Sequence, residues 1–178
     1  MLWNFAGIPE LWAVRGIPWN CRKSLYFAEI FKNILDCAPD TLDARVGLFE
    51  TLTQLGEFTL AREHLDYALA LSPYNVELRI TRSSIAINVG EHAIAADDLA
   101  VAIAAAPAFV PLWTAYLPAV AIGERPEEAL SKVRSLGVDP PNDLSLSIEF
   151  ARIELGAGER SDAEYRIKAI VAENPQDP

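Results

Sequence analysis

With 178 residues, the chain is long enough for one ordinary domain or about five stacked helical hairpins. Its formal net charge of −10 is spread along the sequence, which disfavours nucleic acid and anionic membrane surfaces as partners. Two cysteines that share no Cys-x-x-Cys motif, Cys21 and Cys37, and two separate histidines, His64 and His92, predict neither a disulfide framework nor a zinc site.

The first 21 residues are predicted to form an irregular arm, because two prolines, Pro9 and Pro18, exclude one continuous helix. The arm carries three of the four tryptophans and one phenylalanine, which are the side chains expected to dock it: Trp3, Phe5, Trp12 and Trp19. It either folds back over an exposed end or groove of its own chain, or inserts into a partner, since tryptophan is a frequent hot-spot residue.

The start of the chain also bears on location. It lacks a basic leader and its apolar residues are interrupted by proline and glycine, so it does not match a secretory signal. The sequence contains no uninterrupted apolar run long enough for a membrane span. We therefore expect a cytoplasmic protein with no membrane-spanning segment.

Residues 22–39 read as a single helix, because Phe27, Phe31, Ile34 and Leu35 recur at helical spacing. Pro39 lies 34 residues before Pro73, so this helix is expected to be the second helix of a degenerate repeat. The arm then takes the place of the missing first helix.

A period of 34 residues organises the remainder, residues 40–178, into four repeats. Small, aliphatic and proline positions recur in phase: Ala61, Ala95, Ala129 and Ala163; Leu65, Leu99, Val133 and Ile167; Pro73, Pro107, Pro141 and Pro175. Glycines precede the alanines at Gly56, Gly90 and Gly158, while the third copy has Gly123 one place early. Glycine suits a tight turn between two helices and proline ends the second helix, so each repeat is predicted to be a helix-turn-helix unit.

The repeat length and the Ala-x3-aliphatic pattern that ends in proline resemble the tetratricopeptide repeat family. The first-helix half of the family pattern is poorly kept, with its tryptophan present only as Trp113. The resemblance covers roughly residues 42–175 and implies an all-α, right-handed α-solenoid of about four to five repeats.

The pattern makes several local predictions. Thr41 or Asp40 can cap the first complete repeat, and Ser161 and Glu164 form a capping box. Pro118 must either kink its helix or leave a carbonyl free. Core positions are expected to include Leu78, Ile85, Val89, Trp113 and Tyr116.

Arg82 stands where the family usually has an apolar residue, so it should reach solvent or pair with Asp97 or Asp98. Those two adjacent carboxylates are otherwise read as a solvated face.

The resemblance also implies that the first helices line a concave groove. By position in the repeat, its lining would be Asp43, Val46, Glu50 and Thr53; Glu77, Ile80, Ser84 and Ile87; Thr114, Pro118 and Ala121; and Ile148, Arg152 and Leu155. Family members that grip a chaperone's C-terminal carboxylate use basic and asparagine residues at these places, which this chain lacks. The apolar floor instead fits an amphipathic helix or an extended apolar segment.

No nucleophile, base, phosphate-loop or metal pattern stands out, so neither an enzyme nor a cofactor-binding protein is predicted. The preferred hypothesis is a non-catalytic adaptor whose groove holds a protein segment. The alternative is a structural subunit of a larger assembly, docked through the arm and an uncapped C-terminal end at Ile167, Ile170 and Val171. An oligomer or hetero-complex through these ends remains open, and a catalytic or small-molecule role is disfavoured.

Overall fold

The computed structural model describes residues 19–173, and within that range it is built entirely of helices. The side chains of residues 19–22, 170 and 173 are outside the description. The predictions for Trp3, Phe5 and Trp12, and for the side chains of Trp19, Cys21 and Ile170, therefore lie outside the described residues. The chain divides into two compact units, one up to Pro73 and one from Tyr74 onward.

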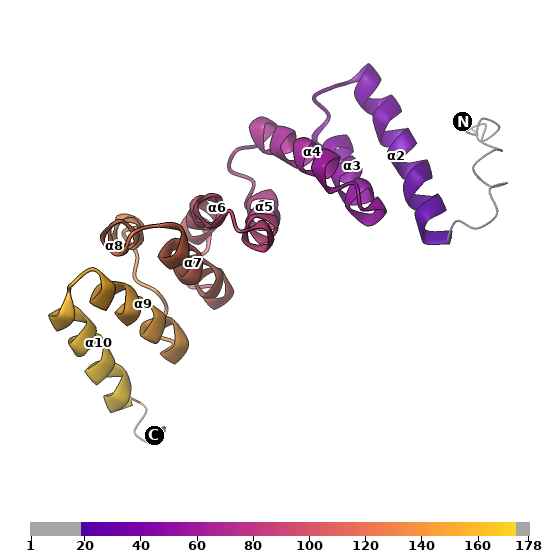
Figure 1. Cartoon of the computed structure of the whole chain (residues 1–178). Coiled ribbons are helices and arrows are strands. Elements are labelled where there is room, and N and C mark those ends of the chain that lie inside the picture. Colours follow the sequence, from indigo (N-terminus) through magenta and orange to yellow (C-terminus); the bar gives the residue numbers. More distant parts are fainter. Residues whose placement is uncertain (1–18, 174–178) are drawn as a thin grey trace. The chain divides into compact units, whose positions relative to one another are not determined.

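The first unit contains α2 (Trp19–Cys37), α3 (Leu42–Leu55) and α4 (Phe58–Leu71). Figure 1 shows this order, and α3 packs on both α2 and α4. Helix α2 begins at Trp19, three residues before the predicted start, directly after Pro18. The repeat positions Ala61 and Leu65 are buried in α4, together with Ala68 and Leu69 on the same face.

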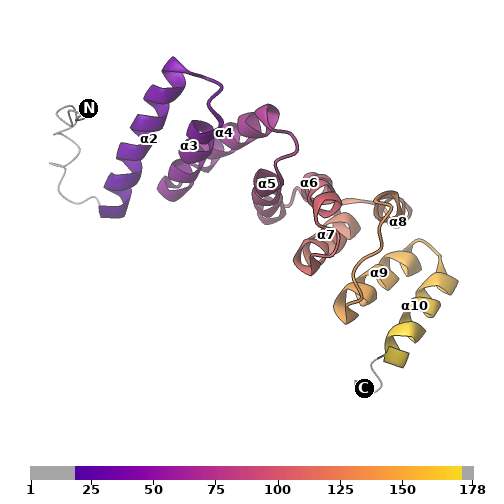
Figure 2. The same cartoon turned by 180° about the vertical axis from the view of Figure 1, so that it is seen from behind.

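The second unit contains three further hairpins: α5 (Val76–Val89) with α6 (His92–Ala105), α7 (Val110–Gly123) with α8 (Pro126–Ser135), and α9 (Leu144–Gly156) with α10 (Arg160–Glu173). Figure 2 shows the same helices from behind. Helix α6 packs on α5 and on α7, and α9 packs on α7, α8 and α10. Consecutive packing of short hairpins confirms the predicted helical-repeat fold.

Three hairpins turn at a glycine in the left-handed region. Gly56, Gly90 and Gly158 have φ of 82°, 82° and 84°, a conformation that other L-residues adopt only with strain. In each turn the following glutamate donates its main-chain N–H to a carbonyl five residues back, as in Glu91 to Ala86 at 2.8 Å. The period in the sequence therefore reflects one turn used three times.

The third hairpin, α7–α8, turns differently. Gly123 is the last residue of α7, and Glu124 has extended backbone with φ −132° and ψ 162°. A Cβ on Gly123 would lie 2.9 Å from the main-chain nitrogen of Ala93. This glycine therefore permits close packing of α7 against the start of α6, rather than a left-handed turn.

The core of the second unit gathers around Trp113 and Tyr116, as predicted. Both side chains are buried, their rings meet edge to face with centroids 6.0 Å apart, and Trp113 Nε1 donates to the carbonyl of Pro107 at 2.7 Å. The repeated alanines Ala95 and Ala129 are buried too. Small residues at these points let the two helices of a hairpin approach closely.

Two capping predictions and one core prediction are wrong. Thr41 precedes α3, but its hydroxyl donates to the Ala38 carbonyl at 2.9 Å instead of capping the helix. Ser161 lies inside α10, whose first helical bond runs from Ala163 N–H to Glu159, so no capping box forms. Val89 is 59% exposed, because it is the last residue of α5 and the chain then folds back on the Ala86 side.

Arg82 pairs as predicted, within a buried cluster. Its Nε and Nη2 donate to the Asp98 carboxylate at 2.6 and 2.7 Å, and Arg79 Nη1 donates to the same group at 2.6 Å. The side chain of Asp98 is fully buried, so it is not part of a solvated face. This cluster joins α5 to α6 at a site where an unpaired charge would be costly.

Candidate functional site: the α7–α9 groove

The predicted groove residues are spread over two units. In the first unit, α3 carries Val46, which is half-buried, and Asp43, Glu50 and Thr53, which are exposed. In the second unit, α5 carries the exposed Glu77 and Ser84. Its Ile80 and Ile87 are half-buried and pack against the hydrophobic core. These two isoleucines therefore stabilise the fold and present little free surface.

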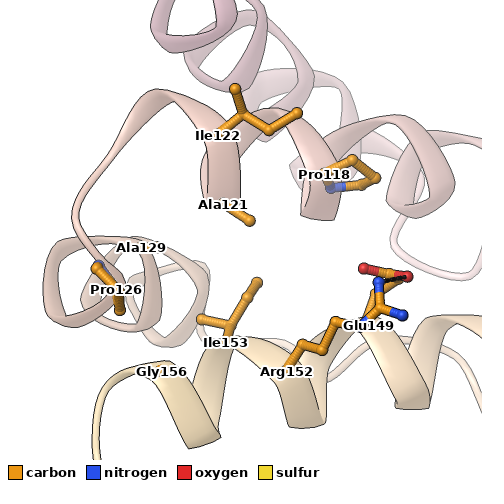
Figure 3. A pocket seen from close by; sticks show the side chains of 9 residues that line it. All are labelled: Pro118, Ala121, Ile122, Pro126, Ala129, Glu149, Arg152, Ile153 and Gly156. Atoms are coloured by element: carbon orange, nitrogen blue, oxygen red, sulfur yellow. Dashed lines mark hydrogen bonds and ion pairs between the residues drawn. The ribbon is translucent and has the colours of Figure 1, made fainter.

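The structure does bring predicted groove residues of α7 and α9 together. A cavity of about 460 Å³ lies between these helices and the start of α8, and its lining is mostly apolar: Pro118, Ala121, Ile122, Pro126, Ala129, Glu149, Arg152, Ile153 and Gly156. Figure 3 shows Pro118 and Ala121 on α7 facing Arg152 and Ile153 on α9, with Ile122 at the margin. We call this cavity, together with the adjoining hollow described next, the α7–α9 groove.

A second hollow adjoins the first. It has a volume of about 340 Å³ and shares Pro118 and Glu149 with the larger cavity. Its other lining residues are Trp113, Thr114, Leu117, Ser145, Leu146 and Ile148. Thr114, Pro118, Ala121, Ile148 and Arg152 were all predicted as groove positions. Leu155 was predicted as well, but it lies outside both linings and is 48% exposed.

The sequence explains why this groove is open and apolar. Pro118 lies inside α7 and has no amide hydrogen, so the carbonyl of Thr114 receives no i→i−4 bond from it. Ala121 is a small residue on the groove side of α7, which leaves room beside the helix. At the α8 end the helices are close, since a Cβ on Gly156 would lie 3.1 Å from the Pro126 Cβ.

Charge is confined to one pair in this groove. Arg152 Nη1 donates to Glu149 Oε1 at 2.9 Å, and the Arg152 side chain is 71% exposed. The opposite charges of Arg152 and Glu149 therefore balance each other at the edge of an apolar surface. The groove therefore offers hydrophobic contact, with one guanidinium and one carboxylate to orient a bound segment.

Titratable groups with shifted pKa values lie elsewhere. Burial raises the pKa of Tyr116 to about 12, which keeps this core phenol neutral. Burial and then the charge of Arg45 lower the pKa of His64, whose Nδ1 lies 3.2 Å from Arg45 Nη1. Lys132 has a raised pKa, chiefly through its hydrogen bond to Glu124. These groups stabilise helix packing and do not converge on a cavity.

Over residues 19–173, no group of three or more His, Cys, Asp or Glu side chains is placed to hold a metal ion. Within the same residues, none of the helices combines the length and the apolar character that a bilayer crossing requires. The arrangement that the structure does show is a surface for apolar contact.

Reasoning from the sequence missed several lining residues. Ile122, Pro126, Glu149, Ile153 and Gly156 were not predicted, because they depend on how α8 and α9 lie beside α7. One signal was present in the sequence: the shifted glycine at position 123 and the proline at 126 mark this hairpin as different from the others.

No protein-family model and no curated protein matches this sequence. Solved structures do match its fold. A structure of MamA from AMB-1 is 16% identical, with a TM-score of 0.57 over 88% of this chain and 94% of that one. MamA from Desulfovibrio magneticus RS-1 is 14% identical, with a TM-score of 0.52 over 90% of this chain and 99% of that one. A tetratricopeptide repeat protein from Parabacteroides merdae is 16% identical, with a TM-score of 0.49 over 89% of this chain and 66% of that one.

Proposed function

Because the chain has the fold of the tetratricopeptide-repeat proteins, we propose that it is a non-catalytic scaffold that binds a helical or extended apolar segment of a protein partner in the α7–α9 groove. The observation that carries this proposal is the pair of adjoining apolar hollows between α7 and α9. Folds of stacked helical hairpins commonly bind other polypeptides on such surfaces.

The chemistry of the groove indicates what it would accept. Two hollows that share Pro118 and Glu149 suit two apolar side chains of one segment, held side by side. The exposed part of Ile148 and the side chain of Ile122 offer hydrophobic contact at the margins. A net charge of −10 favours a protein over a nucleic acid, and the proposal keeps the cytoplasmic location expected from the sequence.

Affinity capture from the native source, followed by mass spectrometry, identifies the partner, and binding of its apolar segment is then measured by calorimetry. Two groove variants, Ala121→Glu and Ile148→Glu, should each weaken binding by about 100-fold, because an unpaired carboxylate in an apolar contact costs about 3 kcal/mol. Val89→Glu is the matched control, since Val89 is exposed on α5 and lines neither hollow. Binding that is equal in wild type and groove variants would contradict the proposal.

A second candidate function is a structural subunit of a larger assembly, docked partly through α10. The observation that favours it is the exposed apolar surface of this helix: Tyr165 is 78%, Ile167 is 42% and Val171 is 62% exposed. In this case Val171→Glu should abolish co-purification with the assembly, whereas Ala121→Glu should leave it unchanged. The reverse result would favour the groove.

A further inference from the structure

The two hollows of the α7–α9 groove meet at a junction formed by Pro118 of α7 and Glu149 of α9, which line both of them. Helix α7 carries no charged residue between Val110 and Gly123, so the charge at the junction comes from α9. A bound segment that places one apolar side chain in each hollow must pass over this junction. The groups exposed there therefore determine which residue the segment can carry between its two apolar anchors.

Pro118 leaves a main-chain acceptor at the junction. Proline has no amide hydrogen, so the Thr114 carbonyl lacks the helical bond that residue 118 would otherwise donate. The Thr114 hydroxyl donates to the Val110 carbonyl at 3.1 Å, so it adds no donor to the hollow. Thr114 and Pro118 both line the smaller hollow, which places the acceptor at its wall.

Glu149 supplies a second acceptor. Its Oε1 receives a hydrogen bond from Arg152 Nη1 at 2.9 Å, whereas Oε2 receives none from the residues that the structure describes. Figure 3 shows the carboxylate and the guanidinium side by side below Pro118. The pair joins positions i and i+3 of one helix, and its arginine is 71% exposed. Exposed pairs of this kind contribute little, so Glu149 can bind a second cation without a large loss.

These two acceptors favour a cation over an anion at the junction. A carboxylate placed there would meet the Glu149 carboxylate and the Thr114 carbonyl, and both would repel it. An ammonium or guanidinium group can donate to both, and hydrogen bonds between a cation and a carboxylate are stronger than neutral ones. Arg152 does not reverse this preference, because it lines only the larger hollow and its charge is already balanced by Glu149.

We infer that the partner of the α7–α9 groove is a protein segment with a lysine or arginine between two apolar anchors. The anchors occupy the two hollows, and the basic head group donates to Glu149 Oε2 and to the Thr114 carbonyl. The apolar stem of the basic residue packs on the Pro118 ring. On a helical segment the basic residue lies three or four positions from each anchor, and on an extended one two positions, because those spacings share a face.

The overall charge of the protein acts in the same direction, since a formal net charge of −10 attracts a basic segment. This inference rests on the proposed function and adds to it the charge of the residue that the groove selects. The experiment must therefore distinguish a groove that binds no segment from one that binds segments of another charge.

Peptide display on the full chain makes this distinction. Short randomised peptides are selected for binding to the wild type and then depleted on Ala121→Glu, which puts a carboxylate into the larger hollow. The surviving peptides should share a lysine or arginine between two apolar residues. Survivors without an enriched basic residue, or with an acidic one, would overturn this inference and leave the proposed function standing. If no peptide survives the depletion, the proposed function fails and the inference fails with it.

A double-mutant cycle then locates the contact. In one selected peptide, norleucine replaces the basic residue, which keeps an apolar stem and removes the charge. Glu149→Gln should weaken binding of the basic peptide about 10-fold, or about 1.4 kcal/mol, and leave binding of the norleucine peptide unchanged. Pro118→Ala restores an N–H that bonds to the Thr114 carbonyl, so it should also narrow the difference between the two peptides. Glu127→Gln is the matched control, because Glu127 is an exposed glutamate of α8 that lines neither hollow.

The norleucine peptide also reports on folding. If it binds Glu149→Gln as tightly as it binds the wild type, the variant is folded and its groove is intact. An equal loss of both peptides in Glu149→Gln would mean that the glutamate acts through packing, and the assignment would be overturned. Equal affinity of the wild type for the two peptides would overturn it as well.

Discussion

Replacing Asp98 with alanine is the sharpest test of how the second unit is held together. Asp98 is fully buried and receives three hydrogen bonds of 2.6–2.7 Å from Arg79 and Arg82 on α5. The arginine side chains are 19% and 23% exposed, so water can reach part of each guanidinium. The aspartate is thus the buried partner that joins α5 to α6.

The expected magnitude follows from this geometry. Hydrogen bonds to a charged group contribute about 1.5–3 kcal/mol each, and breaking a buried ion pair costs about 3–5 kcal/mol. The two arginines recover some hydration after the change, so the three bonds do not add in full. We expect Asp98→Ala to lower the free energy of unfolding by about 3 kcal/mol.

The neighbouring residue supplies a matched control. Asp97 is 68% exposed and lies 3.0 Å from Lys132 Nζ, which also contacts Glu124 at 2.7 Å. An exposed pair of this kind contributes about 0–1 kcal/mol, so Asp97→Ala should change stability little. Urea unfolding followed by circular dichroism measures both variants under the same conditions.

A double-mutant cycle separates the pair from general damage to the helix. Arg82→Ala combined with Asp98→Ala should cost less than the sum of the two single changes, because both single variants break the same interaction. The reasoning is refuted if Asp98→Ala falls within about 0.5 kcal/mol of wild type, the range usual for surface substitutions. It is also refuted if Asp97→Ala and Asp98→Ala cost the same.

Three further predictions concern packing and ionisation in the second unit. Gly123→Ala should lower the free energy of unfolding, measured in urea, by about 1–3 kcal/mol, because the added Cβ would meet the Ala93 main chain. Gly90→Ala should cost less, because its Cβ would point into open space and only the left-handed backbone is strained, at about 1–2 kcal/mol. In an ultraviolet titration of the folded protein, Tyr116 should ionise near pH 12. Unfolding returns its pKa to about 10, so the free energy of unfolding should fall as the pH rises from about 10 to 12. Tyr116→Phe should lessen that fall. Trp113→Phe removes the indole hydrogen bond of 2.7 Å and part of a buried ring, so a loss of about 2 kcal/mol is expected in thermal or urea unfolding; no measurable loss would contradict this packing.

The sequence by itself determined the repeat and most of its helices. A period of 34 residues in alanine, aliphatic and proline positions depends only on local chemistry: glycine tolerates the left-handed turn, alanine permits close helices and proline stops a helix. The pairing of Arg82 was predictable for the same reason, because a charge at an apolar position requires a partner.

Where local chemistry offered alternatives, sequence reasoning was less successful. Thr41 and Ser161 are both suitable caps, yet neither side chain caps a helix: the Thr41 hydroxyl donates to the Ala38 carbonyl, and Ser161 lies inside α10. Val89 has helical spacing with the core, but the direction in which the chain turns back at Gly90 leaves it exposed. These outcomes depend on the path of the chain beyond the helix itself.

Only the tertiary structure decided where the α7–α9 groove lies. It also decided that Asp98 is a buried partner of two arginines while Asp97 is exposed. Ile122, Pro126 and Ile153 come from three different helices, so no spacing in the sequence brings them together. Asp97 and Asp98 are adjacent and chemically identical, and packing alone buries one and exposes the other. Local conformational preferences act within a turn or a helix, whereas cavities and buried charges arise from the distances between helices, and those distances depend on every side chain at the contact.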